Sequence, residues 1–144
     1  MPRVSLWFFA VAPLYVLVGM GLGIFMGANN DFALAPAHAH LNLLGWVTMA
    51  LYGTFYALAR DASKKLAWTV FALANTAVII MIPSLSMVLK FGPQSAFIAP
   101  LVVSEFITVA GMACFALSVW GVLLKARRED QQRSAMLARP SAAE

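Results

Sequence analysis

The sequence predicts an all-α integral membrane protein with four transmembrane helices that run up and down in a single domain. Of its 144 residues, 62% are hydrophobic and 11% are charged, whereas charged residues make up about a quarter of an average soluble domain. Four apolar stretches stand at residues 5–26, 37–59, 66–89 and 96–124. Each reaches the ~20 residues that cross about 30 Å of hydrocarbon. The loops between them are short, so consecutive helices are expected to be antiparallel neighbours.

The first apolar stretch has to be distinguished from a secretory signal peptide, because Arg3 precedes it and small residues follow it. Signal peptides have an apolar region of about 7–15 residues, and this stretch is longer. Its removal would also leave three helices. We therefore expect a retained first transmembrane helix. After the fourth stretch, residues 125–144 form a short basic tail.

The basic residues gather on one side of this layout. They flank the first stretch, fill the second loop and follow the fourth stretch, as Arg3, Arg60, Lys64, Lys65, Lys125, Arg127 and Arg128. The other two loops carry only Asp31 and Lys90. Because basic loops stay in the cytoplasm, both termini are expected there, as in a multi-pass protein of the bacterial inner membrane. These anchors and their contact with anionic lipid account for the net charge of +4, so no nucleic-acid partner is expected.

Small residues indicate close helix packing. Gly19, Gly23 and Gly27 recur every four residues in the first stretch, a pattern that lets a second helix approach closely. Packing is the simpler interpretation, and room for the flat face of a macrocycle is the alternative. Cys114 is the single cysteine, so one chain offers neither a disulfide nor a thiolate cluster.

Both histidines of the chain, His38 and His40, stand at the start of the second stretch, just after Pro36. Proline suits the first turn of a helix. At about 100° per residue the two imidazoles point about 200° apart, so they cannot chelate one ion from a regular helix. They serve two different sites or two different neighbours. Imidazole is the commonest metal ligand and can carry protons, but bonds to headgroups, water or loop backbone are the plainer alternative.

The helical pattern gives the two histidines different surroundings. His38 is expected to share a face with Gly45, Met49, Tyr52 and Tyr56, and His40 to lie over Leu44, Val47 and Leu51. The second of these faces is wholly aliphatic. A neutral histidine there is fully satisfied if one ring nitrogen binds iron and the other bonds to a backbone carbonyl or an Asn.

Four other polar residues in the apolar stretches are candidates for supporting roles. Glu105 is open to several interpretations: a proton relay, a ligand to a second metal, a hydrogen bond to His38 or Asn75, or a protonated side chain bonded to Ser or Thr. Asn42 and Asn75 are expected to form bonds between helices. Tyr52 is expected mainly to pack, with a role in proton relay or in supporting a metal ligand as the alternative.

The run from His38 to Tyr56, His-Ala-His-Leu-Asn-Leu-Leu-Gly-Trp-Val-Thr-Met-Ala-Leu-Tyr-Gly-Thr-Phe-Tyr, resembles the histidine-bearing helices of the haem–copper oxidase catalytic subunit. It is more closely similar to small four-helix membrane proteins commonly labelled oxidase subunit I-like. The catalytic subunit consists of three arcs of four helices, and this chain has the size of one arc. In the last arc, a His-x-His pair near the external end of the second helix ligates two different haems. The resemblance implies that His38 holds a high-spin haem and His40 a low-spin one.

The chain also departs from that family. Its third and fourth stretches contain no histidine, and no tyrosine follows a histidine at the spacing of the family's cross-link. The copper ligands of the oxidases are therefore missing, and a complete oxygen-reducing centre is not implied.

These observations lead us to expect a b-type haem protein with His38 and His40 as ligands, active in electron transfer or in binding a diatomic gas such as O2 or NO. If a haem is held by two histidines, the second ligand has to come from another copy, since one helix cannot turn both rings to one iron. The three-arc arrangement of the resembled family then makes a homotrimer the natural assembly. Two alternatives stay open: a cofactor-free structural or assembly subunit, and a copper or proton carrier that uses His38, His40, Met49 and Glu105. Enzymatic turnover is left open.

Overall fold

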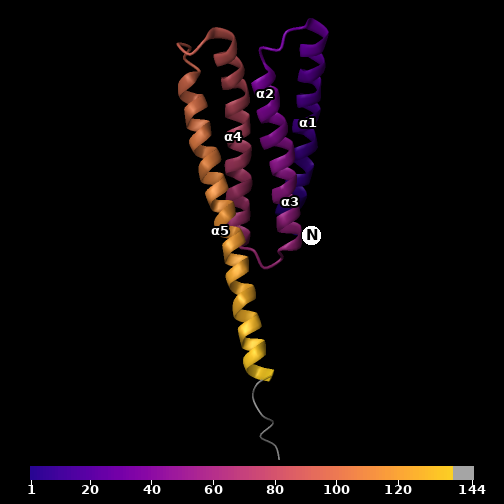
Figure 1. The fold of residues 1–144 in the computed structure, drawn as a ribbon, viewed down its shortest axis with the longest axis vertical. Helices are drawn as coiled ribbons and strands as arrows, with labels where there is room; N and C mark the ends of the chain where they lie inside the picture. Colours follow the sequence, from indigo (N-terminus) through magenta and orange to yellow (C-terminus); the bar gives the residue numbers. More distant parts are fainter. Residues whose placement is uncertain (138–144) are drawn as a thin grey trace, which may run out of the picture.

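The computed structural model describes residues 1–137 and consists, over that range, of helices without any strand. Four helical rods are long and apolar enough to cross a membrane. They are α1 (Arg3–Asn29), a continuous second rod made of α2 (Ala35–His40), η1 (Leu41–Thr48) and α3 (Met49–Leu58), then α4 (Lys64–Phe91) and α5 (Ile98–Leu137). Figure 1 shows them running alternately up and down. The predicted all-α, four-helix membrane fold is confirmed.

The last helix is longer than the sequence pattern suggested. We expected a polar tail from residue 125, but α5 continues without a break to Leu137 and extends beyond the other helices (Figure 1). The extension is rich in Ala, Arg, Gln and Glu, which favour helix. Nζ of Lys125 also lies 3.9 Å from Oε1 of Glu129, four residues later. An ion pair at this sequence separation stabilises a solvated helix. The rest of the expected tail, residues 138–144, lies outside the described residues.

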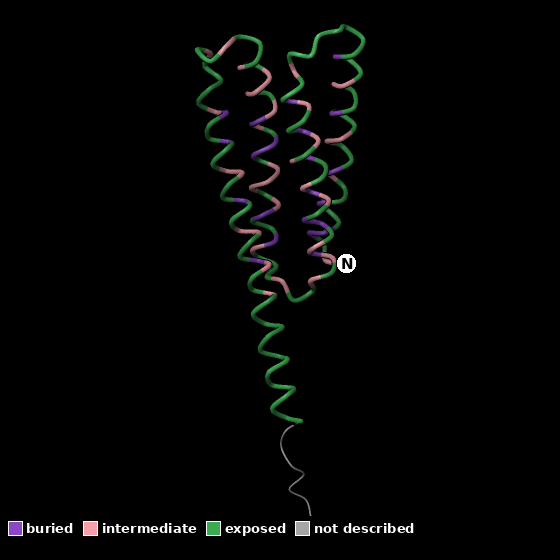
Figure 2. The backbone as a smooth tube through the Cα atoms, viewed as in Figure 1, coloured by how far each residue is buried: buried purple, intermediate pink, exposed green. Residues whose placement is uncertain are grey.

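An aromatic cluster ties the four rods together. Phe8 of α1 is fully buried, stacks on Tyr56 with ring centres 6.0 Å apart, and meets Phe71 of α4 edge-on at 5.1 Å. The ring centre of Phe115 in α5 lies 4.4 Å from the ring centre of Tyr52. Buried residues follow the inward sides of the helices in Figure 2. The cluster therefore fixes the relative positions of the rods at mid-height and towards the end that holds the N-terminus.

Glycines allow α1 to approach the second rod. A Cβ on Gly45 would lie 2.8 Å from the ring of Tyr15, and one on Gly53 would lie 3.0 Å from Phe8. Gly19 and Gly23 face the second rod in the same way, whereas a Cβ on Gly27 would meet nothing within 4 Å. The predicted packing role is thus confirmed for two of the three glycines in the stripe.

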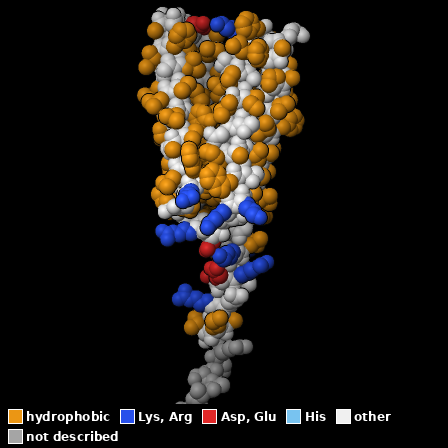
Figure 3. All heavy atoms as spheres, turned by 180° about the vertical axis from the view of Figure 1, so that it is seen from behind, with side chains coloured by type: hydrophobic (Ala, Val, Ile, Leu, Met, Phe, Trp, Pro, Cys, Tyr) orange, Lys and Arg blue, Asp and Glu red, His pale blue; other side chains and the backbone are white. Residues whose placement is uncertain are grey.

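The surface divides into an apolar belt and a charged end. Hydrophobic side chains cover most of the four-helix region in Figure 3, and Lys and Arg side chains lie below it. We call this lower region the basic end; it carries Arg3, Arg60, Lys64, Lys65, Lys125, Arg127 and Arg128. The opposite end, with the loops at residues 30–34 and 92–97, is called the histidine end. An apolar belt of this kind fits association with a lipid bilayer.

Candidate functional site

A π-helical segment follows directly after the histidines. Within η1 the Thr48 hydroxyl donates to the carbonyl of Leu43, five residues earlier, at 2.8 Å. Segments of π-helix are rare and frequently occur at functional sites. Buried residues recur along the second rod at every fourth position, as Ala37, Leu41, Gly45 and Met49.

The contacts of the second rod agree with the face expected for His38. Its ring packs against Gly19 and Gly23 of α1, and Gly45 of the same rod packs against Tyr15 of α1. His38 is half-buried on this face, whereas Gly45 and Met49 are buried.

His38 has a hydrogen-bond partner at each ring nitrogen, one on α1 and one on its own rod. Its Nδ1 lies 2.9 Å from the carbonyl oxygen of Gly19, and its Nε2 lies 3.0 Å from the amide nitrogen of Asn42. A carbonyl can only accept, so Nδ1 carries the proton and Nε2 accepts from Asn42. A Cβ on Gly23 would lie 3.1 Å from Cε1 of the ring. His38 therefore occupies a fitted position as a neutral imidazole.

Asn42 acts on His38 and forms no bond between helices. Its amide donates one turn back along its own rod to His38, while its Oδ1 is buried without a hydrogen-bond partner. That oxygen lies against α1 so closely that a Cβ on Gly19 would collide with it. The expected interhelical bond of Asn42 is therefore absent, because the side chain reaches the nearer acceptor on its own helix.

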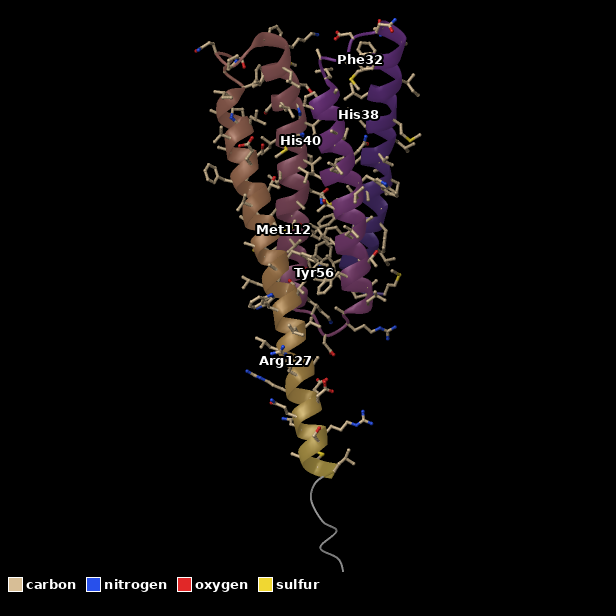
Figure 4. The ribbon with its side chains drawn as sticks, in the orientation of Figure 1. Phe32, His38, His40, Tyr56, Met112 and Arg127 are labelled. Carbon is tan, nitrogen blue, oxygen red and sulfur yellow. The ribbon has the colours of Figure 1, made fainter. Side chains whose placement is uncertain are left out.

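His40 has the opposite character. Its Nδ1 lies 2.8 Å from the carbonyl of Pro36, to which it donates, and the side chain is exposed on the outer surface. In Figure 4 His38 lies on the α1 side of the second rod and His40 on the side towards α4. The divergence expected from the two-residue spacing is thus observed. Within residues 1–137, Nε2 of this exposed ring has no hydrogen-bond partner.

The ring of His40 fits the requirements of a metal ligand. Ligating histidines almost always donate their other N–H to a carbonyl, carboxylate or water, which fixes the tautomer and the ring orientation. Here the carbonyl of Pro36 has that role, as expected for the aliphatic face. Of the expected aliphatic neighbours, Val47 and Leu51 are exposed and Leu44 is half-buried, and Leu43, one turn on from His40, is also exposed. These apolar side chains suit the flat face of a macrocycle. His38 does not fit in the same way, because both of its ring nitrogens have partners.

Glu105 has none of its expected contacts. It is exposed on α5, and within residues 1–137 it forms no hydrogen bond or ion pair. The predicted bonds to His38, Asn75 or a Ser or Thr are therefore wrong for the single chain. The adjacent Ser104 is buried and donates to Leu101 of its own helix, so Ser104 faces inward and Glu105 faces outward.

Asn75 and Tyr52 have structural partners. The Tyr15 hydroxyl donates to Oδ1 of Asn75 at 2.9 Å and joins α1 to α4, which confirms the interhelical role of Asn75. Tyr52 is buried in the aromatic cluster and contacts Met112 Sδ at 3.7 Å. The sequence reasoning missed Tyr15. A phenol in mid-membrane needs a hydrogen-bond partner, and that need was the available signal.

The ligand candidates do not converge within one chain. Among residues 1–137 no group of three His, Cys, Asp or Glu side chains could hold a metal ion. Met49 is fully buried, whereas His40 and Glu105 are exposed on different helices. One chain thus offers a single open imidazole, and the four residues of the copper alternative do not form one site.

Comparisons with family models, with curated proteins and with solved structures give no match for this chain. The geometry of the two histidines is therefore the basis for a functional proposal.

Proposed function

We propose that the chain is a b-type haem-binding membrane protein, and that His40 is the axial ligand that each copy presents to iron. The observation that carries the proposal is the state of His40: Nδ1–H is fixed by the carbonyl of Pro36 at 2.8 Å, and Nε2 is open on an apolar outer face. An imidazole exposed in an apolar belt is unfavourable unless it has a partner. A ligated metal supplies one.

A haem bound there supplies electron transfer when six-coordinate, or the binding of a diatomic gas such as O2 or NO when five-coordinate. The chain's own residues hold the imidazole in one tautomer and surround it with aliphatic side chains. Such an apolar setting limits water access and tunes a bound metal.

His38 is the second proposed ligand, and it acts from a neighbouring copy. Its Nε2 becomes available only when Asn42 releases it, while the bond from Nδ1 to Gly19 keeps the ring oriented. In a closed ring of identical copies every interface is the same. Each iron would then take His40 from one copy and His38 from the next, and a homotrimer remains the proposed assembly.

The proposed location is the bacterial inner membrane, with the basic end in the cytoplasm and the histidines near the periplasmic side. Support comes from the segregation of Lys and Arg to one end of the apolar belt.

A cofactor-free structural subunit is the second candidate, and one observation favours it: His38 is already satisfied by hydrogen bonds within the chain. A copper or proton carrier is less favoured, because its four residues are dispersed.

A visible absorption spectrum, reduced minus oxidised, of protein purified after expression with added haem precursor tests the proposal. We expect a Soret band and an α-band in the native protein and the loss of most bound haem in His40→Ala. Leu58→Ala, a truncation on the exposed surface at the other end of the same rod, is the matched control and should retain haem. Colourless native protein, or haem content in His40→Ala equal to that of the control, contradicts the proposal; bound copper without haem favours the carrier.

A further inference from the structure

A pocket at the basic end lies between the first turns of α1 and α4. It has a volume of about 340 Å3 and is lined by Pro2, Arg3, Val4, Lys64 and Trp68. The two cations come from helices far apart in the sequence. Among residues 1–137, neither is within ion-pair distance of a carboxylate, since Asp61 at the same end pairs with Lys125 at 3.0 Å. The pocket is therefore a concave site with two uncompensated positive charges.

The charge of this pocket is reinforced by its surroundings. α1 begins at Arg3 and α4 begins at Lys64, so the positive ends of two helix dipoles are directed to the same place. A smaller adjoining pocket shares Pro2, Val4 and Lys64 and adds Arg60. This arrangement favours an anionic group.

The remaining features favour a lipid over a free anion. The indole of Trp68 is 42% exposed at the pocket wall, and tryptophan is enriched at the level of lipid headgroups. A second, apolar pocket of about 190 Å3 is lined by residues of α1, η1 and α4, among them Tyr15, Val18 and Ile79. On α4, Lys64, Trp68 and Ile79 fall on one face at helical spacing.

The two pockets are separated by a suitable distance for one acyl chain. At ~1.5 Å per residue, Val4 of the charged pocket and Tyr15 of the apolar pocket lie about 16 Å apart along α1. One leaflet contributes about half of a ~30 Å hydrocarbon core. A phospholipid with its phosphate at the basic end would thus reach the apolar pocket with an acyl chain.

We propose that the pocket lined by Arg3, Lys64 and Trp68 binds the phosphate of an anionic phospholipid from the leaflet at the basic end, with an acyl chain that reaches the apolar pocket lined by α1, η1 and α4. The site is separate from the histidines and does not depend on haem binding.

Native mass spectrometry of the purified full chain in a neutral detergent tests this site. The protein is titrated with phosphatidylglycerol or phosphatidylcholine, and the dissociation constant of the first bound lipid is measured. We expect phosphatidylglycerol to bind about tenfold more tightly or better. Lys64→Gln should weaken it about fivefold, the factor that corresponds to ~1 kcal/mol for one cation near an anionic lipid.

Lys65→Gln is the matched control, because it removes the same charge from the next residue, which does not line either pocket. It should change the affinity by less than about twofold. Lys64→Arg, which keeps the charge at the same position, should retain lipid preference and separates loss of the charge from misfolding of the Lys64 variant.

Three results would overturn the proposal: no preference between the two lipids, an equal loss in Lys64→Gln and Lys65→Gln, or displacement of the lipid by inorganic phosphate at the lipid's own concentration. The last result would identify a site for free phosphate.

Discussion

Two imidazoles separated by one residue meet opposite environments in this chain. His38 is enclosed by Gly19, Gly23 and Asn42, whereas His40 is exposed and, within residues 1–137, bonds only to Pro36. The difference follows from where the rings point and from the absence of side chains on α1 opposite His38. Glycine at these positions is a steric requirement for the polar group made by His38 and Asn42.

Replacement of Gly19 by alanine tests this requirement. The added Cβ would collide with Oδ1 of Asn42, so either the Asn42 amide or α1 has to move. Overpacking of this kind destabilises by about 1–3 kcal/mol. We expect a lower midpoint in thermal unfolding followed by circular dichroism in detergent.

Gly21→Ala is the control for that experiment, because a Cβ on Gly21 would meet nothing within 4 Å. It should be neutral or stabilising by up to ~1 kcal/mol through helix propensity. Equal midpoints for the two variants would show that Gly19 does not serve the close approach.

At the level of elements, the sequence predicted the four rods and their order well, because each rod is an apolar run of sufficient length. It predicted helix ends less well. The fourth helix extends to Leu137 because helix-forming residues continue after the apolar run ends. The π-helical turn of η1 was not predicted, since its residues Leu41–Thr48 have no distinctive composition.

The packing between helices limited the prediction of the site. The opposed directions of the histidines depend only on a local two-residue spacing and were predicted correctly. The bonds of His38 to Gly19 and Asn42 depend on how α1 packs against η1, and such packing is not encoded in a periodic pattern. Glu105 was misplaced for the same reason, because the face that α5 turns towards α4 is set by tertiary contacts.

Removal of the Thr48 hydroxyl tests whether the π turn of η1 contributes to stability and to haem binding. It donates to the carbonyl of Leu43 at 2.8 Å, whereas Thr54 in α3 donates to Ala50, four residues earlier. Thr48→Val should remove a bond specific to the π turn and destabilise the protein by about 0.5–1.5 kcal/mol. It should also reduce bound haem under the proposed function.

Thr54→Val removes an ordinary α-helical back-bond of the same chemistry, so it should change stability by less and leave haem content unchanged. The measurements are thermal unfolding and the Soret absorbance per chain. Identical behaviour of the two valine variants would mean that the π turn has no special role.

At the scale of the whole molecule, one chain presents polar groups that a lipid surface does not satisfy. His40 has an open Nε2, and Glu105 is exposed on α5 within the apolar belt. Polar groups in such positions usually face a partner or a cavity. Both groups therefore favour an assembly of several copies, although they lie on different helices.

The proposed trimer predicts a definite stoichiometry. If each interface takes His40 from one copy and His38 from the next, the purified particle should contain three chains and one haem per chain. Light scattering gives the mass of the particle, and iron analysis with the pyridine haemochrome spectrum gives the number of haems per chain.

His38→Ala should keep haem on His40 but convert the iron from low-spin to high-spin, because one of two axial imidazoles is lost. A symmetric dimer joined by two copies of His40 would instead contain half a haem per chain and stay low-spin in His38→Ala, and that outcome would contradict the trimer and assign His38 to packing alone.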